Sequence, residues 1–421
     1  MATTDENMEQ VLSDETNSDF ESVNTNTGLT AIKQIEERSY AIIERLRTQV
    51  FAPDSTKTLN LRFTAADAGK MVGRTPQHIR LSEKNGKLPS PDTDDFGRRN
   101  YTLDQVNHMR DVFGTLPYRA ETDEPIIMAV SSFKGGVGKS TITTHIAQDF
   151  ALKGYRVGVI DCDPQGSTTL MFGLNPDYDL DRLDTIYPFL SGEVSDNNLD
   201  EYNTLHYALR QTYWPNIQLI PANLFLYNAE YELAAQARED AQHLYRLKEG
   251  IDSIKDQFDI ILIDPPPALG MISLSVLNCA NALLIPVPPS NVDFSSTAHF
   301  FTMLSDTLSL LEERGMSADY KFVKVLVSRK DERKQSQKDI SEMMRIVYGA
   351  DMLNAQMKDS AEVDNAATNF MTVLEQSAPT GSRGTYKRAR AFIQAVGNEI
   401  ELEVRKTWPS HHEALKNDGL I

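Results

Sequence analysis

The order of apolar and polar positions divides the chain into segments of different character. Residues 1–27 are acidic, carry many Ser, Thr and Asn and few large apolar side chains, so we expect this segment to be disordered. From Leu29 to Val50, apolar residues recur at helical spacing among Gln, Glu and Arg, which predicts an amphipathic helix over 28–52 that ends before Pro53. Two interpretations stay open: the helix packs on the next domain, or it dimerises the protein.

Residues 60–115 predict a small helical unit. The stretch from Phe63 to Gly73 is typical of an N-capped helix closed by a glycine, and Thr75 and Pro76 are typical of the cap and first position of the next helix. A turn-rich segment follows, and a further helix begins at Thr102. Two short helices joined by a glycine turn, then an extended wing, indicate a winged helix-turn-helix domain.

Beyond this unit, strand-like runs alternate with helical ones from residue 126 to residue 406. The runs are 126–132, 155–161, 217–221, 260–264, 282–286 and 322–328. The alternation predicts an α/β domain with a mostly parallel sheet flanked by helices. We interpret 116–125 as a linker in front of it, and 407–421 as a loose tail in which His411 and His412 are solvated.

Composition indicates where in the cell the protein is expected to be. No apolar run approaches the roughly 20 residues that a membrane-spanning helix needs, and the acidic N-terminus is unlike a signal peptide. We therefore expect a cytoplasmic protein without a membrane partner. The two cysteines, Cys162 and Cys279, lie in apolar settings and are interpreted as buried free thiols.

The charge balance has to be considered segment by segment. The net charge of −18 taken alone argues against binding to nucleic acid, whose phosphates require Lys and Arg. Between Arg62 and Arg110, however, nine basic residues outnumber six acidic ones. The small helical unit is therefore basic within an acidic chain, which favours DNA binding over a helical adaptor with a solvated basic face.

Three motifs each follow a predicted strand, at the sheet edge where ligands bind in parallel α/β folds. The first is the glycine-rich loop Lys134–Thr141, whose N–H groups would wrap phosphates while Lys139 supplies charge and Ser140 ligates Mg²⁺. Phe133 stands where the usual phosphate-loop pattern has its first glycine. The second motif holds Asp161 and Asp163, and the third is the apolar run 260–264 that ends in Asp264. Together they indicate the nucleotide site of a P-loop NTPase.

The residues of these motifs resemble the ParA/MinD family of deviant Walker ATPases. The family loop K-G-G-x-x-K-[ST] corresponds to Lys134, Gly135, Gly136, Val137, Gly138, Lys139 and Ser140, and its D-x-D-P-Q-G corresponds to 161–166. The resemblance runs from about residue 127 to residue 396. With the helix-turn-helix in front, the chain is similar to type Ia plasmid-partition ParA proteins and to the RepA proteins of repABC-type cassettes.

The resemblance implies a set of roles. Two subunits sandwich two ATP molecules, and Lys134 reaches the phosphates of the partner subunit. Lys139 holds the phosphates, Ser140, Asp161 and Asp264 surround Mg²⁺, and Asp163 orients the attacking water. Such a site would bind ATP and ADP through 134–141 and hydrolyse ATP slowly, with stimulation by a partner.

Two DNA surfaces are predicted. The small helical unit resembles the MerR-type winged helix, which implies that Gln77, His78 and Arg80, after the cap Thr75, approach base edges. Arg98 and Arg99 would grip phosphates or a minor groove. The second surface rests on a family segment that matches 327–333, where Arg333 and Lys334 would bind DNA without sequence preference. A solvated helix face is the alternative for this second surface.

The resulting hypothesis is a DNA-partitioning ATPase that also represses its own operon. The ATP dimer would bind nucleoid DNA and meet a ParB-type centromere-binding protein, and the ADP or nucleotide-free form would bind its operator. A nucleotide-sensing repressor without a motor role is the alternative from another class. A membrane-cycling MinD-like protein is disfavoured, because 406–421 does not provide an amphipathic basic helix. A metabolic kinase is disfavoured because no acceptor-substrate motif is found.

Overall fold

The structure is a computed structural model that describes residues 28–50, 57–93, 97–132, 134–191, 200–313, 319–379 and 381–421. The acidic segment 1–27 and Phe133 lie outside the described residues. The chain divides into two units, Met1–Thr58 and Leu59–Ile421. The described part of the first unit contains α2 (Leu29–Val50), where the sequence predicts a helix, and Leu29, Ile32 and Ile35 are exposed on it.

The second unit begins with a small sheet and three helices. Its elements are β1 (Phe63–Thr64), α3 (Ala65–Met71), α4 (Pro76–Lys84), β2 (Asp92–Thr93), β3 (Arg99–Tyr101) and α5 (Leu103–Phe113), with the antiparallel sheet order β1-β3-β2. A side-chain cap starts each helix, because the hydroxyls of Thr64, Thr75 and Thr102 accept backbone N–H groups of the first turn. Gly73, with a φ of +64°, turns the chain between α3 and α4.

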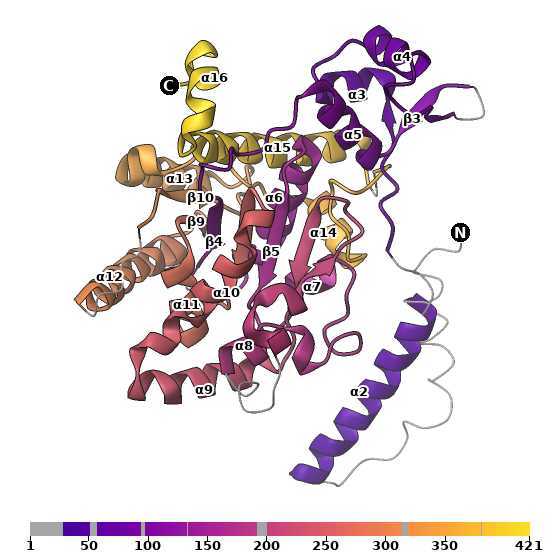
Figure 1. Cartoon of the computed structure of the whole chain (residues 1–421). Helices are drawn as coiled ribbons and strands as arrows, with labels where there is room; N and C mark the ends of the chain where they lie inside the picture. The colour runs from indigo at the N-terminus through magenta and orange to yellow at the C-terminus, as the bar shows by residue number, and fades with distance from the viewer. Residues whose placement is uncertain are drawn as a thin grey trace. The chain divides into compact units, whose positions relative to one another are not determined.

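A seven-stranded sheet forms the centre of the second unit (Figure 1). Its strands are β4 (Ile126–Val130), β5 (Val157–Asp161), β6 (Arg210–Gln211), β7 (Ile217–Ile220), β8 (Ile260–Asp264), β9 (Ala282–Val287) and β10 (Phe322–Val327). The order is β10-β9-β4-β8-β5-β7-β6, and every neighbouring pair is parallel except β6 with β7. The mostly parallel sheet predicted from the sequence is confirmed.

Helices cover both faces of this sheet, so the strands are buried on both sides and read as continuous apolar runs. They are α6 (Lys139–Lys153), α7 (Ser167–Met171), α8 (Tyr187–Ser191), α9 (Leu226–Glu239), α10 (Arg246–Ile254), α11 (Met271–Cys279), α12 (Asn291–Glu313), α13 (Gln335–Tyr348), α14 (Ala361–Thr368) and α15 (Arg383–Lys406). Successive residues of a strand join different cores: Met128 packs in one with α6 and α15, and Ala129 packs in the other with α9, α10 and α11.

The end of the chain differs from its prediction as a loose tail. A short 3₁₀ turn (Pro409–His411) and α16 (His412–Asn417) follow α15, and Trp408 is completely buried in the main core. The indole Nε1 of Trp408 donates to the carbonyl oxygen of Glu124 at 2.8 Å. His411 stacks its ring edge on Trp408 at 5.0 Å between centroids, so this histidine is part of the packed end rather than solvated. The prediction failed because one buried tryptophan outweighs the polar residues around it.

The segment 116–125, interpreted as a linker, is also fixed to the domain. Arg119 is buried, and its guanidinium donates to the carbonyl oxygens of Phe258, at 3.0 Å, and Asp123, at 2.7 Å. The carboxylate of Asp123 accepts from Ser410 near the chain's end. Both cysteines are buried and free, as predicted. Among the described residues, no helix is both long and apolar enough to cross a bilayer.

Candidate nucleotide site

The three predicted motifs lie at the carboxyl ends of three neighbouring strands, β4, β8 and β5. The Cα atoms of Asp161 and Asp264 are direct partners in the parallel ladder between β5 and β8. Because parallel strands end at the same edge of a sheet, the glycine-rich loop after β4 reaches this edge too. The fold thus gathers residues that are more than a hundred positions apart in the sequence.

The glycine-rich loop passes directly into α6. Gly136 and Gly138 have φ angles of +76° and +94°, which residues with a Cβ rarely adopt. Gly138 is the N-cap of α6, so Lys139, Ser140 and Thr141 form the first turn, whose N–H groups have no partners within the helix. Such a helix start, with the positive end of the helix dipole, is suited to bind phosphate. Lys139 is buried at this position.

The carboxyl groups of Asp161 and Asp264 are both buried, and the pKa of each is raised. Burial is the main cause for both, and repulsion by Asp264 raises the pKa of Asp161 further. The pKa of Asp264 rises to about 6, because burial outweighs the opposite effects of the nearby Ser140 hydroxyl, of the charge on Lys139 and of the hydrogen bond from Thr168. A cation at this site would relieve the repulsion between the two carboxylates.

One oxygen of this pair fits a metal ion. Oδ1 of Asp264 is buried and has no hydrogen-bond partner among the described residues, whereas its Oδ2 accepts from Thr168 Oγ1 at 2.7 Å. Mg²⁺ typically takes one or two carboxylates together with phosphate oxygens and water. Among the described residues no group of three or more His, Cys, Asp and Glu side chains can hold an ion. The donor set therefore fits Mg²⁺ that arrives with a nucleotide.

Asp161 accepts more hydrogen bonds than Asp264, its neighbour on β8. Its Oδ2 accepts from both N and Oγ1 of Thr169, at 2.8 and 2.7 Å, and its Oδ1 accepts from the N–H of Asp163 at 3.1 Å. These bonds hold the loop after β5 in place. Asp163 is largely buried and accepts the N–H of Gln165 at 3.0 Å. The sequence analysis did not single out Thr168 and Thr169, although both lie within three residues of the end of the second motif.

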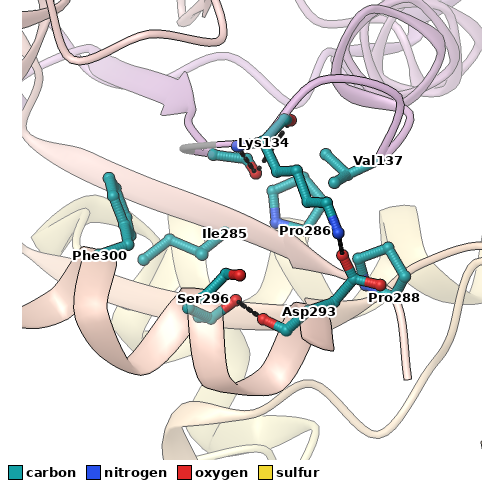
Figure 2. Close-up of a pocket in the computed structure, with 10 residues that line it drawn as sticks. Lys134, Val137, Ile285, Pro286, Pro288, Asp293, Ser296 and Phe300 are labelled. Atoms are coloured by element: carbon teal, nitrogen blue, oxygen red, sulfur yellow. Dashed lines mark hydrogen bonds and ion pairs between the residues drawn. The ribbon is translucent and has the colours of Figure 1, made fainter. Parts of the chain in front are cut away.

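Lys134 is held by a residue that the sequence analysis missed. Its Nζ makes an ion pair with Oδ1 of Asp293 at 2.5 Å, as Figure 2 shows. Asp293 lies in the first turn of α12, and its other oxygen accepts from the hydroxyl of Ser290. The side chain of Lys134 is 45% exposed, so it is accessible at the surface. The only sequence signal for Asp293 was its place three residues after a capping serine.

The residues predicted to read DNA bases lie on one short helix. On α4, Gln77, His78 and Arg80 are exposed and Ile79 is buried, and Thr75 accepts the N–H of His78 at 3.2 Å as the N-cap. His78 also packs against the ring of Phe113, with 5.2 Å between centroids. The helix therefore presents a polar face to solvent.

The two wing arginines differ in their surroundings. Arg98 is exposed, whereas Nε of Arg99 donates to Glu83 at 2.9 Å. Tyr101 donates to the same carboxylate at 2.7 Å, and burial raises the pKa of this tyrosine. Arg99 thus ties β3 to α4, and Arg98 is the more exposed of the two.

The second predicted DNA surface follows β10. The side chains of Arg333 and Lys334 are 88% and 62% exposed, and both approach Asp331. Arg333 forms two hydrogen bonds with that carboxylate, at 2.8 and 3.0 Å.

The fold and the arrangement of the three motifs define a P-loop NTPase. A sequence model of the family described as "AAA domain" matches residues 126–313. Protein SopA of Escherichia coli K12 is 34% identical over 83% of this chain and 89% of its own length, and a putative replication protein A of Rhizobium rhizogenes is 30% identical over 90% and 96%. The solved structure of a partition protein has a TM-score of 0.63 at 21% identity and covers 89% of this chain and 98% of its own. The chain belongs to the ParA-type family of plasmid partition ATPases.

Proposed function

We propose that this chain hydrolyses ATP with Mg²⁺ in a sandwich dimer of two copies, and that this cycle segregates plasmid or replicon copies. The observation that supports the site most directly is the unpartnered, buried Oδ1 of Asp264, beside Ser140 at the start of α6. A bare carboxylate oxygen is costly to bury unless a ligand completes it. Mg²⁺ would neutralise charge on the phosphates there.

The side chains divide the work around the substrate. The N–H groups at the start of α6 and the charge of Lys139 would hold the phosphates of ATP or ADP. Asp163, fixed by Asp161 through the loop after β5, would orient the attacking water. Lys134 would leave Asp293 and add charge to the partner subunit's phosphates, where negative charge develops during the reaction. Hydrolysis by positioning and charge alone agrees with slow turnover that a partner accelerates.

Two substitutions separate binding from hydrolysis. Lys139→Ala should lose ATP binding, and Asp163→Ala should bind ATP but lose its hydrolysis, measured by calorimetry and phosphate release. Asp177→Ala, an exposed aspartate, serves as a control. The wild type would be tested with DNA and a ParB-type protein present. No hydrolysis under these conditions would contradict the motor and favour a repressor that only senses nucleotide.

The ATP form is proposed to bind nucleoid DNA without sequence preference through the loop that holds Arg333 and Lys334. Both side chains are exposed and basic. Replacing both with Glu should abolish ATP-dependent retention on random duplex. The same double change at Arg238 and Lys416, which are exposed on α9 and α16, should leave retention intact. Equal retention by the two double variants would contradict this DNA surface.

The ADP or nucleotide-free form is proposed to act as an autorepressor that binds its operator through α4. Gln77→Ala combined with Arg80→Ala should remove the shift of upstream operon DNA in electrophoresis, because both side chains extend from the exposed face. Lys84→Ala, at the far end of the same helix, is the matched control. Comparing ADP with ATP tests the switch. An unchanged shift by the double variant would contradict the assignment.

A further inference from the structure

The residue after β10 has an unusual backbone. Arg329 has a φ of +50°, a left-handed conformation that residues with a Cβ seldom adopt. Among the described residues, the only other non-glycine residue with a positive φ is Phe370. Such conformations persist where the surroundings impose them, and they are common at functional sites.

The residues on either side of Arg329 are fixed by backbone hydrogen bonds. The N–H of Ser328 donates to the carbonyl of Val287 at 3.0 Å, and Ser328 is completely buried. The N–H of Lys330 donates to the carbonyl of Met357 at 3.3 Å. With both neighbours held, Arg329 is the point at which the chain turns, and its side chain is exposed.

The guanidinium of Arg329 reaches the glycine-rich loop. Its Nη1 donates to the carbonyl oxygen of Gly136 at 3.0 Å, across 193 positions of sequence. A Cβ built on Gly135 or Gly136 would meet no atom within 4 Å, so this side of the loop has no close packing to hold it. Beside the packing of the buried Val137, polar contacts orient this part of the loop, and the charged donor of Arg329 is a strong one.

This contact has a consequence on the other side of the same peptide. The peptide between Gly136 and Val137 is planar and trans, so its C=O and its N–H point in opposite directions. When Arg329 holds the C=O on its own side of the loop, the N–H of Val137 is turned to the opposite side. N–H groups of such loops are the phosphate ligands of P-loop proteins.

We propose that Arg329 is a positioning residue of the nucleotide site, which fixes the 136–137 peptide so that the loop is ready for the phosphates of a nucleoside di- or triphosphate. This inference rests on the proposed ATP site. The strained backbone, the fixed neighbours and the hydrogen bond to the loop all point to this role. Arg333, four residues further along the chain, pairs with Asp331 instead of with the glycine-rich loop.

Three substitutions at Arg329 test the proposal in the full chain, with ATP and Mg²⁺ as the probe in calorimetry. Arg329→Met keeps the length and loses the donors, and Arg329→Gly removes the side chain and relieves the backbone. Both should raise the Kd for ATP by about tenfold or more, the effect of one hydrogen bond from a charged donor. Arg329→Lys keeps a charged donor and should stay within about twofold of the wild type.

Controls separate positioning from folding and from the wider hypothesis. Arg238→Met, at an exposed position on α9, should bind ATP like the wild type. The melting temperature of Arg329→Gly should equal or exceed that of the wild type, because strain is removed. Wild-type affinity in both the Met and the Gly variant would overturn the role of Arg329 alone. If the wild type binds ATP no better than Lys139→Ala, the proposed nucleotide site itself fails, and this inference fails with it.

Discussion

Lys134 is paired with Asp293 within its own subunit, and in the proposed dimer this contact would break before the lysine reaches the second subunit. Asp293→Asn should free the lysine while keeping an acceptor for the start of α12. We expect the concentration for half-maximal ATP-dependent dimerisation to fall about fivefold, which corresponds to about 1 kcal/mol for an exposed pair. Analytical ultracentrifugation measures it.

The matched control for that change is Asp306→Asn, which removes the same charge from an exposed position on the same helix. If both variants dimerise alike, net charge rather than the ion pair with Lys134 governs association. A loss of dimerisation in Asp293→Asn would show that Asp293 contributes to the interface itself.

His145, one turn into α6, makes stability depend on pH. Its ring is buried between the carbonyl of Thr141, 2.7 Å from Nδ1, and the N–H of Val373. Burial lowers its pKa from 6.5 to about 4. Because the folded value lies below the unfolded one, the stabilisation is complete above pH 6.5 and is lost as the pH falls toward 4. The loss amounts to about 3 kcal/mol at most.

Glutamine at position 145 tests this pH dependence because it does not titrate. Urea unfolding of His145→Gln and of the wild type should show a stability difference at pH 7 that shrinks as the pH falls to 4. His108→Gln, at an exposed position on α5, should follow the wild type at every pH. A difference that stays constant with pH would contradict the buried neutral ring.

At the scale of elements, two helix ends show how context changes the cost of one substitution. Gly114 ends α5 with a φ of +63° in open space, and Gly154 ends α6 with a φ of +104° against the side chain of Arg110. Gly114→Ala should cost about 1 kcal/mol for the backbone. Gly154→Ala should cost about 3 kcal/mol, because a Cβ would lie 2.9 Å from Arg110.

Urea midpoints of the two glycine variants measure this difference. The crowding matters because Arg110 is buried without an acidic partner among the described residues, and burial lowers its pKa to about 10. Its guanidinium donates to the carbonyl of Leu152 at 2.6 Å, which joins α5 to the end of the phosphate-loop helix. Equal costs for the two variants would mean that Arg110 moves aside freely.

The regular elements were predictable where the signal is local. The run 260–264 matches β8 completely, and the other five central strands were found within two residues, because buried parallel strands are continuous apolar runs. The short edge strand β6, with only Arg210 and Gln211, was not predicted, since it forms through pairing with β7 rather than through its own pattern.

The residues of the candidate site also differ in whether their local sequence reveals them. Its glycine-rich loop and aspartates are contiguous motifs at strand ends, which sequence patterns detect. Asp293 and Arg329 act through contacts with residues more than 150 positions away, and nothing in their local sequence specifies the partner. Arg99 is a residue type that often contacts phosphates, and only the fold shows that its guanidinium is paired with Glu83.

At the scale of the whole molecule, Trp408 anchors the last segment of the chain in the core of the second unit. It is completely buried, 6.1 Å from the ring of Tyr155, and bonded to Glu124. Trp408→Ala should lower the free energy of unfolding by about 3–5 kcal/mol. Leu420→Ala, at an exposed position, should change it by less than about 0.5 kcal/mol. Thermal unfolding measures both, and a small effect at Trp408 would contradict its packing.

Because residues 116–125 are attached to the rest of the unit, a cut within them should not separate the two parts of the chain. Arg119 is held by Phe258, and Asp123 is held by Ser410, so the segment is tied both to the sheet and to the chain's end. Trypsin should spare the buried Arg119. A nick elsewhere in the segment would leave two fragments that travel together on a native gel and part only in denaturant. Fragments expressed separately on either side would each expose surface that normally covers the other.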